Sequence, residues 1–166
     1  MGRWDVPDQL GEVDFALAAF RQDGAWQLQD IASPAFESVE SLSHALRRLP
    51  GDAGAVGMVV VDEDFFVLVR VEGSTTRVLL SDVTAADEWE LAQSAIDFLG
   101  LPPPEDDDVE VPAGDLDLLA DLGLHADEMG ALLDEVELYP DEVLSDIAGR
   151  LGFGTLFDDM VGLTSA

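Results

Sequence analysis

The chain of 166 residues carries 36 acidic side chains against seven basic ones, all of them arginines, and its formal net charge is −29. This balance argues against binding to nucleic acids or to anionic membranes, since both require cationic side chains that contact phosphates. The chain has no cysteine, which excludes disulfides, thiolate metal sites and cysteine nucleophiles.

The hydrophobic content of 48% predicts a protein with a substantial core rather than a disordered acidic chain. The N-terminal stretch lacks the apolar region of a secretory signal, and no apolar run reaches the roughly 18 residues of a membrane span. We therefore expect a cytoplasmic protein. Two interpretations of the charge stay open: it serves solubility or reflects compositional bias, or it attracts a basic protein surface over long range.

The first predicted element is a β-hairpin. Apolar runs at residues 13–21 and 25–31 flank Gln22-Asp23-Gly24, and Asp-Gly between two such runs favours a type I′ turn. This turn places Arg21 opposite Trp26, which predicts a cation–π pair.

A helix is predicted next, from a cap at Ser38 to about Leu49, before Pro-Gly ends it. His44 lies four residues after Glu40 on this helix, a spacing typical of a surface pair.

The stretch Ala55–Thr84 is the most apolar part of the chain and predicts three consecutive strands joined by tight turns. In the second strand Phe65, Val67 and Val69 share one apolar face. The second turn would place Arg70 opposite Arg77, and like charges in that position are unfavourable unless an acid or a ligand lies between them. One interpretation is a carboxylate of the chain itself; the alternative is an anion site formed by the two arginines.

The stretch Thr84-Ala85-Ala86-Asp87 resembles a capping box and predicts a helix to about Leu99, with Trp89 in its apolar stripe. After it, three prolines and the run EDDD predict a linker. We therefore expect an α+β sheet domain over residues 1–100, a linker over 101–113 and an acidic helical subdomain over 114–166. The first hundred residues contain 18 acids and six arginines, whereas residues 101–166 contain 18 acids and one arginine.

The C-terminal part predicts four short amphipathic helices, from the segment DLDLLADLG to a last segment with Leu156, Phe157 and Met160. At about 50 residues such a bundle is marginal alone, so it is expected to dock on the sheet domain or on a partner. Its acidic and aromatic side chains are the ones predicted to contact a partner: Asp115, Asp117, Asp121, Tyr139, Asp141, Phe153 and Phe157.

The sequence contains no pattern that predicts catalysis. The signatures of zinc deaminases, phosphate-binding loops, dinucleotide folds and serine hydrolases are missing. Asp62-Glu63-Asp64 does not fit a calcium loop and predicts a solvated turn. The segment DLGLHADEM resembles that of acyl carrier proteins, but it lacks the serine that carries their prosthetic group. We expect no catalytic residue, no cofactor and no metal site.

Taken whole, roughly residues 13–160 resemble an actinobacterial family of tRNA adenosine deaminase-associated proteins. The resemblance is carried by DFFVLVR (64–70), LLSDVTAADEW (79–89), LPPPEDDD (101–108), GDLDLLADLGL (114–124) and ELYPDEVLSDIAGRLGFG (137–154). These are not catalytic motifs, so the resemblance implies association with the deaminase without implying any functional residue.

The predicted order of elements, ββαβββα, is also that of longin, roadblock and profilin-like domains. The analogy implies a five-stranded, mainly antiparallel sheet in the order 2-1-5-4-3, with the acidic helices as an addition.

We therefore expect a non-catalytic interaction protein that binds a basic partner, with the tRNA adenosine deaminase first among the candidates. Its acidic helices would either compete with tRNA or stabilise the enzyme. A small-molecule domain that binds an anion through Arg70 and Arg77 is the alternative, and an unrecognised hydrolase or metal enzyme is the third.

Overall fold

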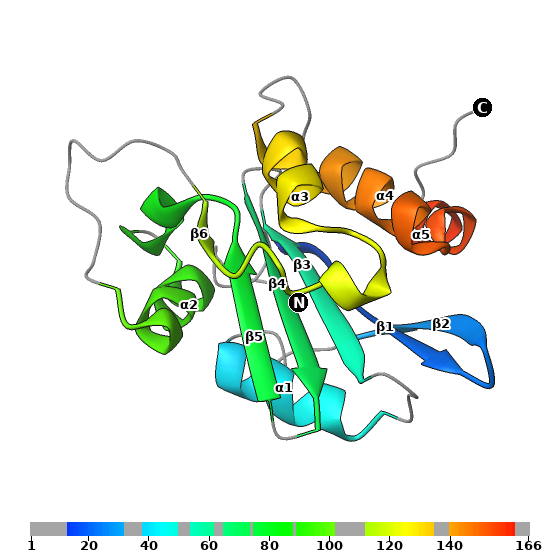
Figure 1. The fold of residues 1–166 in the computed structure, drawn as a ribbon. Helices are drawn as coiled ribbons and strands as arrows, with labels where there is room; N and C mark the ends of the chain where they lie inside the picture. The colour runs from blue at the N-terminus through cyan, green and yellow to red at the C-terminus, as the bar shows by residue number, and fades with distance from the viewer. Residues whose placement is uncertain are drawn as a thin grey trace, which may run out of the picture.

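The computed structural model describes residues 13–31, 38–49, 54–61, 65–73, 75–87, 89–101, 112–134 and 140–161. Within these ranges the chain forms one antiparallel sheet with helices packed on both faces (Figure 1). The strands are β1 (Val13–Gln22), β2 (Ala25–Asp30), β3 (Ala55–Val61), β4 (Phe65–Glu72), β5 (Thr75–Leu80) and β6 (Ala113–Gly114). The α-helices are α1 (Val39–Arg47), α2 (Glu90–Leu99), α3 (Ala126–Leu133), α4 (Pro140–Leu151) and α5 (Gly154–Val161).

The strand order is β2-β1-β3-β4-β5-β6. The predicted order 2-1-5-4-3 is therefore wrong: β3, not β5, pairs with β1, and the described sheet has a sixth strand. Burial explains the arrangement. All seven residues of β3 are buried, as a central strand requires, whereas β5 begins with the exposed or half-exposed residues Thr75, Thr76 and Arg77.

The predicted hairpin is confirmed. Asp23 and Gly24 have φ angles of 56° and 81°, the left-handed values that a type I′ turn needs. Arg21 pairs with Trp26, and the Arg21 guanidinium carbon lies 5.7 Å from the centre of the Trp26 rings.

One face of the sheet is covered by α1 and α2. The Ser38 side chain accepts a hydrogen bond from the backbone N–H of Ser41 and so caps α1, as predicted. Alternate residues of β4, among them Phe65 and Val67, pack under these helices in one buried cluster.

The helix predicted from Thr84 is shorter than expected. Residues Val83–Asp87 form a 3₁₀ helix, and α2 begins only at Glu90. Asp82 provides the physical reason, because its Oδ1 accepts hydrogen bonds from both the N–H and the hydroxyl of Thr84 (2.9 and 2.6 Å) and holds a tight turn there. Trp89, in extended conformation between the two segments, packs against Phe65 as a partly buried core residue.

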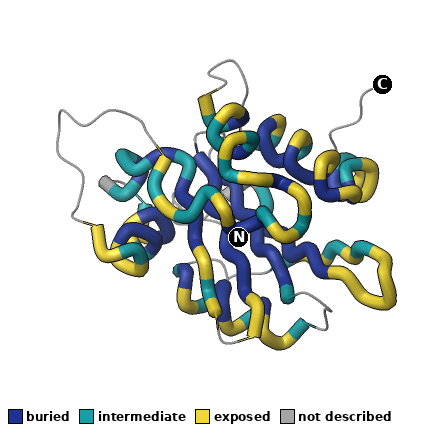
Figure 2. The backbone as a smooth tube through the Cα atoms, in the orientation of Figure 1, coloured by how far each residue is buried: buried dark blue, intermediate teal, exposed yellow. Residues whose placement is uncertain are grey.

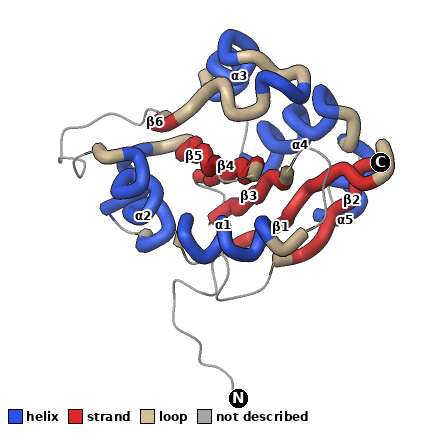
Figure 3. Tube along the Cα trace, turned by 60° about the horizontal axis from the view of Figure 1, so that its bottom comes forward, coloured by secondary structure: helices blue, strands red, loops and turns tan. Residues whose placement is uncertain are grey.

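The other face is covered by the C-terminal layer, defined here as residues 115–161. Figure 3 shows α3 and α4 on the side of the sheet opposite α1 and α2, and Figure 2 shows that the central strands β3 and β4 are buried between the two layers. Strand residues such as Met58 and Leu68 form one cluster with Leu144 and Phe157 of this layer. The predicted docking on the sheet is thus confirmed.

Within this layer the first of the four predicted helices does not form. Turns and a short 3₁₀ helix, Ala120–Leu122, take its place. The side chain of Asp115 accepts a hydrogen bond from the N–H of Asp117, and the following N–H groups bond three residues back, which favours turns over an α-helix.

β6 extends the sheet beyond β5, with Gly114 opposite Leu79. Gly114 has a φ of 123°, and a Cβ there would lie 2.3 Å from the carbonyl oxygen of Val78, so the close pairing requires glycine. β6 spans the boundary predicted between the linker and the helical part. Most of that linker and the turn at 62–64 lie outside the described residues. No described helix is both long and apolar enough to cross a membrane.

Candidate functional site

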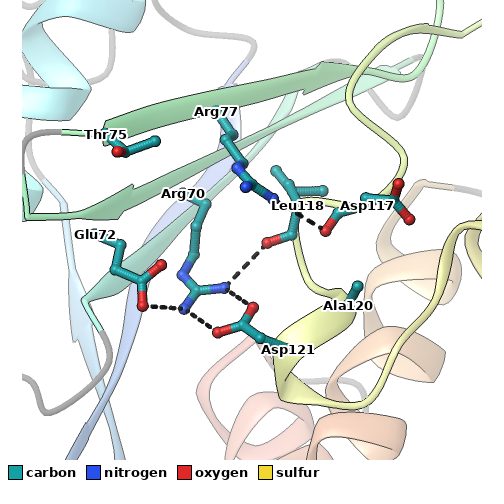
Figure 4. Close-up of a pocket in the computed structure, with 8 residues that line it drawn as sticks. All are labelled: Arg70, Glu72, Thr75, Arg77, Asp117, Leu118, Ala120 and Asp121. Carbon is teal, nitrogen blue, oxygen red and sulfur yellow. Dashed lines mark hydrogen bonds and ion pairs between the residues drawn. The ribbon is translucent and has the colours of Figure 1, made fainter.

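The arginine pair Arg70 and Arg77 lies where strands β4 and β5 face the C-terminal layer. The register pairs Arg70 with Arg77, as predicted. Both belong to the face that packs against residues 115–124, so a mostly apolar interface contains two guanidinium groups (Figure 4). Arg70 is only 2% exposed, whereas almost half of the Arg77 side chain is accessible.

A carboxylate of the chain itself, that of Asp121, pairs Arg70 with the C-terminal layer. Arg70 donates from Nη1 to Oδ1 of Asp121 (2.8 Å) and from Nη2 to Oδ2 (3.0 Å), a bidentate pair, and Nη1 also donates to the Leu118 carbonyl (3.0 Å). The Glu72 carboxylate lies 3.8 Å from Nη2. This arrangement is the first of the two interpretations of the arginine pair.

The electrostatics of the pair follow from this geometry. The hydrogen bond from Arg70 holds the pKa of the Asp121 carboxyl below its ordinary value, with the charges of Arg70 and Arg77 acting in the same direction and partial burial opposing them. Arg77 has its own acidic neighbour, since its Nε lies 3.6 Å from Asp115 Oδ2, and its Nη1 donates to the Asp117 carbonyl at 3.5 Å.

An open cavity of about 310 Å³ lies at this junction. Its charged lining consists of Arg70 and Arg77 together with Glu72, Asp117 and Asp121, and Thr75 adds a hydroxyl (Figure 4). An anionic ligand would have to compete with Asp121 for the Arg70 guanidinium. The cavity can therefore recognise a polar group, but the buried guanidinium of Arg70 is already paired with carboxylates of the chain.

The predicted partner-contacting residues fall into three groups. Asp115, Asp117 and Asp121 lie together at the Arg70–Arg77 junction, and Asp141 lies apart in the first turn of α4. Tyr139 is outside the described residues.

Phe153 and Phe157 form the third group, and they are core residues. Phe153 is 1% exposed and packs on Trp26, while Phe157 is 0% exposed and packs on Phe15. Neither ring has surface left for a partner.

The prediction from sequence missed an exposed apolar pair on α5. Leu156 and Met160 were placed in one stripe with Phe157, but 45% of Leu156 and 40% of Met160 are exposed. Phe153 and Phe157 lie four residues apart, and so do Leu156 and Met160, so spacing sorts the four side chains into two pairs without indicating which pair is buried. Phe98 and Leu101, at the end of α2, are exposed to 46% and 39%.

Comparison with known proteins shows the family of the chain. The family described as "Rv3753c-like tRNA adenosine deaminase-associated protein" matches residues 14–154. The chain belongs to this family. Protein Rv3753c of Mycobacterium tuberculosis (strain ATCC 25618 / H37Rv) is 39% identical over 152 residues, which cover 90% of this chain and 85% of that protein. No solved structure matches the chain.

The resemblance seen in the sequence is thereby confirmed. The matched range includes the Arg70–Asp121 pair and α4, and it ends at the first residue of α5.

A member of the Rv3753c-like family is described as associated with the deaminase, not as the deaminase. The chain has no cysteine, the residue type that supplies two or three of the zinc ligands in zinc deaminases. His44 lies on α1 and His125 precedes α3, so the sheet separates the two histidines (Figure 3). In the described parts of the chain, no three His, Asp or Glu side chains are grouped so that they could hold a metal ion.

Proposed function

We propose that this protein is a non-catalytic binding partner of a basic protein, and that the partner is the tRNA adenosine deaminase. The observation that carries the proposal is the family's description as deaminase-associated. A protein that binds tRNA must present cations to its phosphates. A chain with a net charge of −29 is electrostatically complementary to such a surface and would be steered toward it.

The C-terminal layer is the surface best suited to this role. Residues 115–161 contain 13 acidic residues and a single arginine, Arg150. That arginine is already paired, because its Nε lies 3.0 Å from Asp146 and its Nη1 lies 3.1 Å from Glu128. The layer therefore presents carboxylates with little competing positive charge.

The sheet supports this acidic layer. Leu144, Phe153 and Phe157 anchor its helices in the core, and the Arg70–Asp121 pair fixes the turn at 115–122. A surface held in one geometry loses less conformational entropy when it binds, so the attachment to the sheet favours specific recognition.

The test is affinity purification of the tagged full-length protein from its source cells at low salt, with mass spectrometry of the proteins that remain bound. We expect the deaminase to be recovered above an untagged control and to be depleted in a high-salt wash. Repeated recovery without the deaminase would refute the specific form of the proposal.

The second candidate function, binding of a small anion, is favoured by the cavity at Arg70 and Arg77. An anion bound there would have to compete with the Asp121 carboxylate for the Arg70 guanidinium. A thermal-shift series with phosphate, sulfate and carboxylic acids tests this candidate. A ligand present at a concentration 100 times its Kd stabilises the folded state by about 2.7 kcal/mol. No shift across the series would eliminate this candidate.

A further inference from the structure

We propose that the outer surface of α4 and α5 is the docking surface for the basic partner, with Leu156 and Met160 as its apolar anchor. This inference rests on the proposed function and adds a location to it. The occupant is a protein surface that offers an apolar socket surrounded by lysine or arginine side chains.

The anchor consists of two apolar side chains of α5, Leu156 and Met160, that do not pack in the core. Phe157 is completely buried against the sheet layer, so the helix is held in place without Leu156 or Met160. These two side chains lie four residues apart and therefore form one adjacent apolar spot on the exposed side of the helix. Buried apolar anchors at the centre of an interface, with polar residues around them, are the arrangement that carries most binding energy in protein complexes.

The rim of this surface is acidic. Asp158 and Asp159 lie between the two anchors in the sequence, and Asp159 is exposed. The Ser145 hydroxyl donates to Asp158 Oδ1 at 2.7 Å and ties α5 to α4. On α4 the exposed side includes Glu142 and Asp146, of which Asp146 is also paired with Arg150. Charge complementarity thus specifies a basic occupant, and a second copy of this acidic chain would be repelled.

The other exposed apolar pair provides a matched control. Phe98 and Leu101 on the α2 side have nearly the same exposure as Leu156 and Met160. Phe98 lies in the last turn of α2 and Leu101 follows the helix directly, on the opposite face of the sheet from α5. A general contribution of surface hydrophobicity would affect both pairs, whereas a docking site on α5 affects only one.

The experiment is isothermal titration of the purified tRNA adenosine deaminase of the source organism with the full-length protein. The double variant Leu156→Ser with Met160→Ser is compared with Phe98→Ser with Leu101→Ser, and circular dichroism verifies that both melt like the wild type. We expect the α5 variant to bind at least about 10-fold more weakly and the α2 variant to stay within about twofold of wild type.

Equal effects of the two variants on affinity, or a loss of affinity confined to the α2 variant, would overturn the inference. In either case, binding of the wild-type protein would still support the proposed function. Absence of wild-type binding would overturn both. A second measurement needs no substitution: the deaminase should slow oxidation of Met160 by peroxide, while Met58 and Met129, buried to 1% and 0% exposure, serve as internal references. Unchanged oxidation of Met160 in the complex also counts against the inference.

Discussion

Removal of the Asp121 charge should loosen the C-terminal layer. In Asp121→Asn the buried Arg70 guanidinium loses the carboxylate that it contacts at 2.8 and 3.0 Å. A hydrogen bond to a charged group contributes about 1.5–3 kcal/mol. Because the Asp121 side chain is 52% exposed, water already weakens its ion pair with Arg70, so the loss of stability is smaller than for a buried pair. Asparagine also keeps one acceptor, so we expect a destabilisation of about 2 kcal/mol, near the middle of that range.

The measurement is urea unfolding followed by tryptophan fluorescence. Trp26 reports on the C-terminal layer, since its Nε1 donates to the Leu151 carbonyl at 3.1 Å, and Trp89 reports on the opposite face. In a thermal melt, a loss of about 2 kcal/mol corresponds to a decrease in Tm of about 4–8 °C for a chain of this size.

The matched control is Asp117→Asn, which removes the same charge from the same turn. Asp117 is exposed, and its contact with Arg77 uses the backbone carbonyl, so the control should lie within about 0.5 kcal/mol of wild type. The control also accounts for the relief of repulsion when one of many acids is neutralised. Equal stability of the two variants would refute the assignment of Asp121 as the partner of Arg70.

The pH dependence has a defined sign. The folded state lowers the pKa of Asp121, so its contribution is complete above the unfolded pKa of about 3.9 and is lost as the pH falls through the lower folded value. The stability difference between wild type and Asp121→Asn should therefore be constant from about pH 7 to pH 5 and shrink below about pH 4. A difference that grows on acidification contradicts this assignment.

Three further predictions concern the fold. Gly114→Ala should destabilise the fold by about 1–3 kcal/mol, because a φ of 123° and the nearby Val78 carbonyl leave no room for a side chain. Gly130→Ala on α3, which has open space around it, should instead be stabilising. Urea unfolding of both variants tests the β5–β6 pairing. Phe157→Ala should cost about 3–5 kcal/mol by the same assay, and Met160→Ala should change stability by less than about 0.5 kcal/mol; similar values would show that α5 is oriented differently. Raising NaCl from about 20 to about 300 mM should raise the Tm, because salt screens repulsion among the acids that give a net charge of −29; an unchanged Tm would show that repulsion does not limit stability.

Local features of the fold were predictable from the sequence because short-range chemistry determines them. Asp23-Gly24 determines the first turn, and the short turn after β4 determines that Arg70 lies opposite Arg77. The need for a negative group there, either a carboxylate of the chain or an anionic ligand, also followed, since two guanidinium groups repel each other. Its identity did not follow, because Asp121 is 51 residues from Arg70 and the chain offers 36 acids.

The sheet order and the α5 anchor were missed for a different reason. The predicted and the observed strand orders contain the same hairpins. What distinguishes them is that β3 is completely buried whereas β5 is partly exposed. Likewise Leu156 and Phe157 are both large and apolar. Which of them enters the core depends on how α5 meets the sheet layer, a tertiary constraint that periodicity alone does not contain.

The proposal that this family member binds the tRNA adenosine deaminase through its acidic C-terminal layer can be tested with purified proteins. Titration of the purified deaminase with the wild-type protein at about 50 mM and about 300 mM NaCl tests it most directly. We expect saturable binding at the lower salt that weakens at the higher salt, since exposed charges are screened over about 10 Å at 0.1 M. No binding at either salt would contradict the claim, and an affinity independent of salt would contradict its electrostatic basis.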